Sequence, residues 1–208
     1  MRLLPRVLWL TLGMLAASAG FAQVIQFESG GLTYQTLTRG GLTIMFAHMP
    51  IRIRDYGMIQ VAASNGSSQV LKIRPQDFQF RLSDGRILRG VPAADVIGRF
   101  IRSASSSDVI KLVTTYEAGL YGMGRIRSTN GYEKRRQAAL AVVSSKRLKA
   151  AAAASAIALV ETELKPGEST DGAVFYPLRD RSTGEMTLVV TTAGRVFRFE
   201  PSRPQFER

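Results

Sequence analysis

Short runs of alternating apolar and polar residues, each closed by a turn sequence, most constrain what this chain can fold into. A period of two is typical of a strand that is buried on one face. Paired turn residues, such as Gly30-Gly31 and Asn65-Gly66, supply the positive φ angles that tight connections between antiparallel strands need. We therefore expect an antiparallel β region, with strands inside residues 24–28, 32–38, 42–49, 58–64, 69–75 and 78–85.

The run DFQFRLSDGR shows the pattern at its clearest. Phe78, Phe80 and Leu82 share one face of the expected strand, whereas Gln79 and Arg81 share the other. The three apolar side chains are therefore predicted to lie in the core, and the strand is predicted to end in an Asp-Gly turn.

The pattern changes after residue 90. Residues 91–105, VPAADVIGRFIRSAS, place Pro92 in a first turn and space Val91, Val96, Phe100 and Ile101 at helical intervals, so we expect a short helix. Residues 105–122 fit a second helix or a strand, and the glycine-rich residues 119–132 indicate a loop.

A long segment without Gly or Pro follows, from about residue 133 to Val160. Asn130 can cap it and Glu133 favours the positive end of a helix, so the segment is predicted to be one basic, alanine-rich helix. Its alanine-rich side suits close packing against the protein's own body. Four basic residues fall within about 120° on the other side; these candidate contacts to an anionic surface are Lys134, Arg135, Lys146 and Lys149.

Strand patterns resume at residues 171–178, 185–192 and 195–201, and Thr192-Ala193-Gly194 indicates a hairpin turn. Neither set of strands can close a core alone. The predicted fold is therefore mainly β with a helical insertion: a single antiparallel β-sandwich domain over residues 23–208, interrupted at about 91–163. The proline-containing end, residues 201–208, is predicted to be loosely ordered.

Residues 1–22 are predicted to be a secretory signal peptide. Arg2 and Arg6 precede the apolar run 7–17, and small residues end at Ala22, so cleavage is expected before Gln23. An uncleaved anchor is the alternative. The signal predicts a periplasmic or secreted protein. With no cysteine in the chain, the fold must be stable without disulfides.

Catalytic and metal-binding patterns are absent from the sequence. His48 is the single histidine, there is no Cys, and there is no G-x-S-x-G motif, which excludes thiolate zinc sites and the usual hydrolase elbow. We expect His48 to be a strand-end imidazole with a local hydrogen-bond partner. Three carboxylate pairs could act together, but each has a simpler structural explanation; they are Asp77 with Asp84, Glu161 with Glu163, and Glu168 with Asp171. No enzyme, cofactor or metal is predicted.

The charge and composition of the chain narrow the classes of molecule that it could bind. The formal net charge is +12, and residues 133–160 hold six Lys or Arg against one acid. This segment lacks the aromatic side chains on which bases stack, and export removes the chain from chromosomal DNA, so nucleic acid is a disfavoured partner.

Two segments carry a family resemblance. Residues 61–86, VAASNGSSQVLKIRPQDFQFRLSDGR, and residues 161–178, ETELKPGESTDGAVFYPL, are similar to two signatures of bacterial secreted immunoglobulin-like domains of unknown function. In those signatures an Asn-containing turn leads to a strand, a Pro-x-Asp-Phe turn and an aromatic strand, and a Leu-x-Pro-Gly-Glu turn precedes a Gly-x-Val-Phe strand. The resemblance implies a binding or scaffolding module and brings no catalytic residues.

We therefore expect an exported, non-enzymatic module of the cell envelope that acts through contacts with an envelope protein or a ligand. The alternative is a peripheral module whose basic helix, residues 133–160, binds anionic lipid or a cell-wall polymer.

Overall fold

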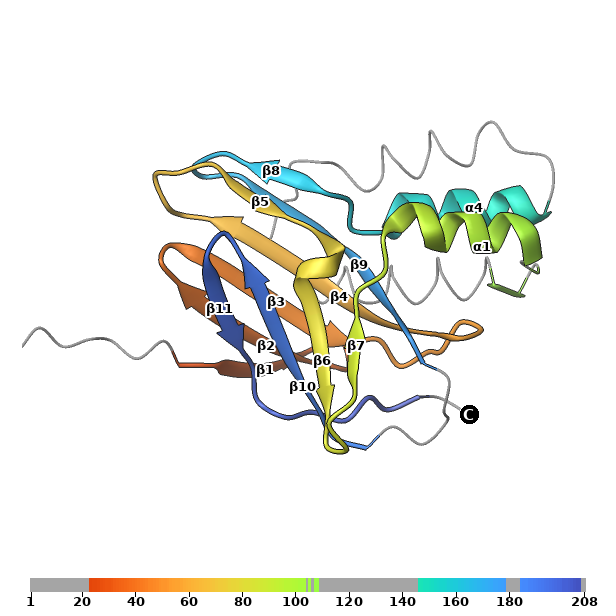
Figure 1. Cartoon of the computed structure of the whole chain (residues 1–208), viewed down its shortest axis with the longest axis horizontal. Helices are drawn as coiled ribbons and strands as arrows, with labels where there is room; N and C mark the ends of the chain where they lie inside the picture. Colours follow the sequence, from red (N-terminus) through yellow and green to blue (C-terminus); the bar gives the residue numbers. More distant parts are fainter. Residues whose placement is uncertain (1–22, 104, 106, 109–145, 179–183, 207–208) are drawn as a thin grey trace, which may run out of the picture.

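The computed structural model describes residues 23–103, 105, 107–108, 146–178 and 184–206, with the backbone alone for 146–150. Antiparallel strands are the main regular structure of this part, and two α-helices accompany them (Figure 1). The strands are β1 (Ile25–Ser29), β2 (Leu32–Arg39), β3 (Leu42–His48), β4 (Tyr56–Asn65), β5 (Leu71–Ile73), β6 (Phe78–Leu82), β7 (Ile87–Arg89), β8 (Thr162–Leu164), β9 (Ser169–Pro177), β10 (Met186–Thr192) and β11 (Arg195–Arg198). The helices are α1 (Ala93–Ser103), α4 (Lys146–Ile157) and the 3-10 turn η1 (Pro75–Asp77).

The strands form two larger sheets and one strand pair. Their orders are β1-β2-β3-β4-β9, β11-β10-β6-β7 and β5-β8, and every pairing between them is antiparallel. The predicted class, mainly β with helices, is confirmed. The hairpin predicted at residues 192–194 joins β10 to β11, with Ala193 and Gly194 both at positive φ.

An inner core lies between the two larger sheets. Because successive strand residues point to opposite faces, Phe46 on β3 and Val61 on β4 point into this core, whereas their neighbours in sequence point away from it. The four-stranded sheet contributes Phe78 and Phe80, both about 1% exposed or less, and Leu82 at 8%. The core positions predicted for β6 are thus confirmed.

A second core covers the opposite face of the five-stranded sheet. Met58 and Phe175 project from that face and belong to the same buried cluster as Val96 and Phe100 of α1. Helix α4 packs beside α1 on the same side (Figure 1). The central strands of this sheet are therefore buried on both faces, which explains why β4 reads as a nearly continuous apolar run.

Alanines hold α4 against the sheet, as predicted. Ala151, Ala153, Ala154 and Ala156 are each 5% exposed or less. The helix stops at Ile157 and not at Val160, because the chain there joins the edge of β9: Ala158 forms a parallel bridge with Ala173, and the Leu159 N–H donates to the Ala173 carbonyl at 2.8 Å. The earlier part of the predicted long helix lies outside the described residues.

Helix α1 confirms the short helix predicted after residue 90. The Pro92 carbonyl accepts from the N–H groups of Asp95 and Val96, at 3.1 and 3.3 Å. Ile101 does not join the core as its spacing suggested, since its side chain is 45% exposed. The helix-or-strand segment and the glycine-rich loop expected next fall almost wholly outside the described residues.

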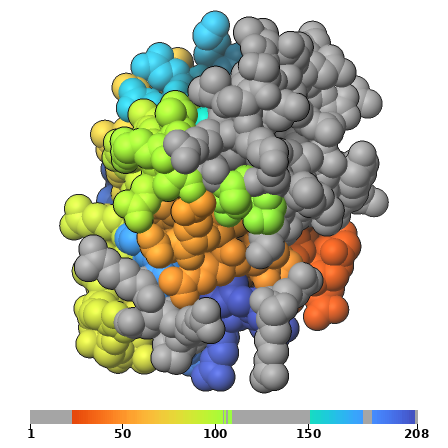
Figure 2. Space-filling model, turned by 90° about the vertical axis from the view of Figure 1, so that its right-hand side faces the viewer, coloured from red at the N-terminus to blue at the C-terminus, as the bar shows by residue number. Residues whose placement is uncertain are grey.

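Ion pairs join α1 and the residues after it to the loop before β4. Arg99 meets Asp55 at 2.8 Å, and Arg54 meets Asp108 at 3.1 Å. Figure 2 shows this region as green surface lying against the orange surface of the loop. None of the helices in the described ranges is long and apolar enough to cross a bilayer.

Two strands escaped prediction. β7 and β8 are three residues each, too short for a period of two to register. β8 begins at Thr162, inside the range expected for the helical insertion, and pairs with β5.

Candidate ligand-binding site

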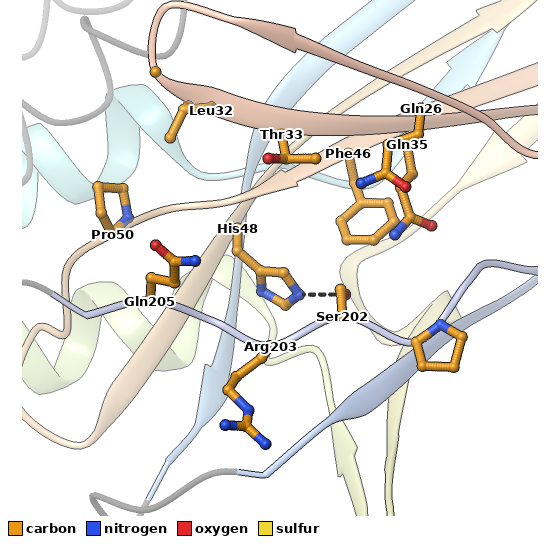
Figure 3. Close-up of a pocket in the computed structure, with 12 residues that line it drawn as sticks. Gln26, Leu32, Thr33, Gln35, Phe46, His48, Pro50, Ser202, Arg203 and Gln205 are labelled. Atoms are coloured by element: carbon orange, nitrogen blue, oxygen red, sulfur yellow. Dashed lines mark hydrogen bonds between the residues drawn. The ribbon is translucent and has the colours of Figure 1, made fainter.

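A pocket of about 310 Å³ opens between the sheet face of β1–β3 and the chain after β11 (Figure 3). We call residues 199–206 the C-terminal segment. The pocket is lined by Gln26, Gly31, Leu32, Thr33, Gln35, Phe46, His48, Pro50, Pro201, Ser202, Arg203 and Gln205.

Strand register determines which side chains reach the pocket. Gln26 on β1 pairs with Gln35 on β2, and Gln35 pairs with Phe46 on β3, so all three point to the same face. Deeper in the molecule this face carries the inner core, including Phe46 itself. At its β1 end the face carries amides and the Thr33 hydroxyl instead, which makes the wall polar.

Hydrogen bonds hold the C-terminal segment at Glu200 and Ser202, which corrects the prediction of loose order for its first residues; residues 207–208 of the predicted range lie outside the described residues. The Gln35 amide donates to the Glu200 carbonyl at 3.3 Å and accepts from the Glu200 N–H at 2.9 Å. On the other side, Ser202 and Met186 exchange two backbone hydrogen bonds of 2.9 Å. The segment thus connects the two large sheets, and Pro201 lies between its two hydrogen-bonded residues.

His48 sits at the end of β3, as predicted, but its partner is distant in sequence. Its Nε2 lies 2.9 Å from the Ser202 hydroxyl, 154 residues away. The ring packs edge-on against Phe46 and tilted against Phe80, with centroids 5.6 and 5.4 Å apart. Its Nδ1 is buried and has no hydrogen-bond partner in the described part of the chain. Burial lowers the pKa of His48 from 6.5 to about 4.

We expect acid to weaken the fold through His48. Its pKa is lower in the folded than in the unfolded chain, so below pH 6.5 the unfolded state binds the proton more readily. Stability from this group is complete above pH 6.5, decreases as the pH falls toward 4, and is lost below that pH; the total loss is about 3 kcal/mol. Among the described residues that line the pocket there is no carboxylate to offset the charge, and Arg203 would oppose it. Urea unfolding at pH 7, 6, 5 and 4.5 measures the effect.

A His48→Gln variant is the control for that titration. Glutamine can keep a hydrogen bond to Ser202 but has no proton to gain between pH 6.5 and 4.5. Its stability should therefore depend less on pH over this interval. An equally steep loss in both proteins would assign the acid sensitivity to other groups.

Within the described residues, the His48–Ser202 pair lacks the third group that would orient the base of a serine hydrolase. A serine nucleophile needs a base oriented by a third group and donors for the oxyanion. Here no described group binds Nδ1, and the low pKa of His48 opposes the imidazolium that proton transfer would form. The pair is a structural hydrogen bond that positions the C-terminal segment.

The carboxylates singled out from the sequence serve local structure. Asp77 pairs with Arg74 and caps its N–H. Asp84 accepts from the Arg86 N–H at 3.0 Å, which lowers the pKa of that carboxyl.

The carboxylates of the other two pairs also make local contacts. Glu161 meets Lys72 at 2.6 Å, with Glu163 4.0 Å from the same amine. Glu168 accepts from the Lys165 N–H in the Pro-Gly turn, whereas Asp171 is buried within β9. The described residues contain no group of three or more potential metal ligands.

The four predicted anionic-surface contacts stay a prediction, because their side chains lie outside the described part of the structure. Lys146 and Lys149 lie in the first turns of α4, where only the backbone is described. Lys134 and Arg135 lie outside the described residues.

The pocket residues were missed because they carry no motif. One signal was available: in LTYQTLT, Gln35 and Thr33 share the face of Leu37, so polar residues stand where alternation predicts core. That departure from the pattern marks the place where the core gives way to the pocket.

Comparisons with known proteins assign neither a family nor a function to this chain. No family model matches the chain, and no curated protein matches it. Among solved structures it is similar to the yjhA protein from Bacillus subtilis, with 12% identity and a TM-score of 0.31, over 80% of this chain and 76% of that one. A likeness this distant supports neither a shared function nor a shared fold.

Proposed function

We propose that the protein is an exported, non-enzymatic binding module that holds an uncharged, hydrogen-bonding ligand in the pocket beside the C-terminal segment. The observation that carries the proposal is the composition of the pocket. Amides, hydroxyls and an imidazole with a pKa of about 4 line it, next to Phe46 and two prolines. A few directed polar groups on an apolar floor are typical of ligand sites, and 310 Å³ is at the small end of their range.

Arg203 gives no reason to assign an anionic ligand. It is the one charged residue in the lining, and its side chain runs away from Thr33 and Gln35 (Figure 3). The sheet wall of the pocket is therefore neutral at pH 7, which favours an uncharged ligand over an ion.

The framework for this site is proposed to be an immunoglobulin-like sandwich. The two segments that carried the resemblance meet at Asn65. Its side chain donates to the Leu164 carbonyl at 2.9 Å, and its backbone exchanges hydrogen bonds with Gly167 and Glu168. Contact between the two signatures supports one framework in which both act as a unit. Export is inferred from residues 1–22 of the sequence.

Binding of anionic lipid or cell-wall polymer is the second candidate. The docked alanine face of α4 weighs against it for lipid, because a helix lying in a membrane interface needs a free apolar face. Sedimentation with anionic vesicles at low and high salt, beside a variant with Lys134, Arg135, Lys146 and Lys149 changed to Gln, separates it from the pocket function.

Filling the pocket should abolish binding of small uncharged probes. Thr33 is exposed and lines the pocket, so Thr33→Trp should occupy the space without entering the core. We expect N-acetylglycine methylamide, glycerol or N-acetylglucosamine to shift amide NMR signals of the pocket residues in the native protein and not in the variant. Thr187→Trp, on β10 of the other sheet, is the matched control and should bind as the native protein does.

Two results would contradict the proposal. Equal shifts in native protein and Thr33→Trp, or none in either, would remove the pocket as a ligand site. Progressive cleavage of the amide probe in the same samples, lost in Ser202→Ala, would make the protein an enzyme.

A further inference from the structure

The way in which the protein holds its own C-terminal segment indicates what else the pocket can hold. Gln35 binds both the N–H and the C=O of Glu200, at 2.9 and 3.3 Å. A side-chain amide has one donor side and one acceptor side, as a peptide group does, so it can match both groups of one residue in an extended chain. The molecule therefore contains a working example of peptide backbone recognition by glutamine.

Gln26 repeats this arrangement one strand further out. It stands directly opposite Gln35 in the β1–β2 register, on the same face. Neighbouring strands lie about 4.8 Å apart, which is also the spacing between two extended chains side by side. Figure 3 shows the two amides next to each other at one end of the pocket.

Unlike Gln35, the Gln26 side chain is left without a hydrogen-bond partner by the residues that the structure describes. This side chain is exposed and lines the pocket. The space in front of it is the pocket, with the C-terminal segment as one wall.

We propose that the pocket binds a short extended peptide, laid beside the C-terminal segment, with Gln26 binding its backbone as Gln35 binds Glu200. This inference rests on the proposed function and names its ligand class. The neutral sheet wall of the pocket agrees with recognition of backbone rather than of charged side chains. Thr33, between the two glutamines and His48 in the lining, supplies a further hydroxyl for a backbone group.

The alternative uncharged ligand, a sugar, has less support. Sugar sites present exposed aromatic faces for the pyranose ring, and the aromatic residue in the lining, Phe46, is only 2% exposed. A sugar remains the competing outcome of the test.

Titration with acetyl-Ala-Ala-Ala-methylamide, followed by NMR of the purified protein, tests the inference. We expect saturable shifts at the side-chain amide signals of Gln26 and at the backbone of Thr33. Gln26→Leu keeps the size of the side chain and removes both hydrogen bonds, so affinity should fall about tenfold or more. Gln79→Leu, on β6 of the other sheet, should leave the affinity unchanged.

The outcomes distinguish failure of the inference from failure of the function. If N-acetylglucosamine shifts the pocket signals and the tripeptide does not, the pocket function stands and the peptide class is wrong. If the tripeptide binds equally well to native protein and Gln26→Leu, the proposed role of Gln26 is wrong. If no probe binds, both proposals fail. Because Gln26 is exposed on an edge strand, an unchanged melting temperature should confirm that Gln26→Leu folds.

Discussion

Replacing Gly172 with valine should destabilise the protein by about 3 kcal/mol or more. A Cβ at this position would lie 2.6 Å from both the N and the Cα of Leu159. These are backbone atoms, and they cannot retreat without breaking the hydrogen bond from the Leu159 N–H to the Ala173 carbonyl. Valine otherwise suits the middle of β9, so the loss would come from the close approach of the two chains. Urea unfolding monitored by circular dichroism measures it.

Gly98→Ala provides the matched control. Gly98 lies inside α1, and the nearest atom to its added Cβ is the end of the Arg102 side chain at 3.5 Å. Alanine has the higher helix propensity, so this variant should be as stable as the native protein or more stable by about 0.5–1 kcal/mol. If Gly172→Val unfolds at the same urea concentration as the native protein, the residues after α4 are not seated on β9.

Replacing Asn65 with leucine should cost about 3 kcal/mol, for a different reason. Asn65 is fully buried, and both the NH2 group and the oxygen of its side-chain amide form hydrogen bonds. It donates to the carbonyls of Gln69 and Leu164, at 2.7 and 2.9 Å, and accepts from the N–H and hydroxyl of Ser67, at 3.0 and 2.7 Å. Leucine has a similar size and leaves the Leu164 carbonyl without its buried partner, while the Ser67 hydroxyl keeps a contact of 3.4 Å with the Gln69 carbonyl, so the penalty is one of polarity and not of space.

Ser67→Ala separates the parts of that network. It removes one hydroxyl and leaves the two carbonyl contacts of Asn65 intact, so a loss of about 1 kcal/mol is expected. Equal losses in Ser67→Ala and Asn65→Leu would mean that the link to Leu164 contributes nothing. In that case Asn65 would serve the local turn alone and would not unite the two segments.

The strands could be predicted because the alternation of apolar and polar residues within each strand determines which of its faces is buried. Alternation in residues 78–82 gives Phe78, Phe80 and Leu82 a common face whatever lies opposite. The end of α4 could not be predicted in this way. Residues 158–160 are as apolar as the helix before them, and they leave it because β9, whose sequence is separate, offers an edge to pair with.

The same distinction explains the pocket. The sequence around Gln35 shows only an alternating strand. Its two hydrogen bonds to Glu200 form only when the fold brings the C-terminal segment next to β2. His48 was noticed as the single histidine, but its partner Ser202 belongs to a segment that its prolines marked as loose. Long-range pairing of polar groups leaves no period in a sequence, whereas a buried face does.

The C-terminal segment has a thermodynamic consequence for any ligand of the pocket. It is at once a wall of the site and the connection between the two sheets, through Met186 on one side and Gln35 on the other. Opening this end of the molecule would therefore destroy the site. By linkage, a ligand at one hundred times its dissociation constant would resist that opening with about 2.7 kcal/mol, so occupancy and protection of the last strand pairings against hydrogen exchange should rise together.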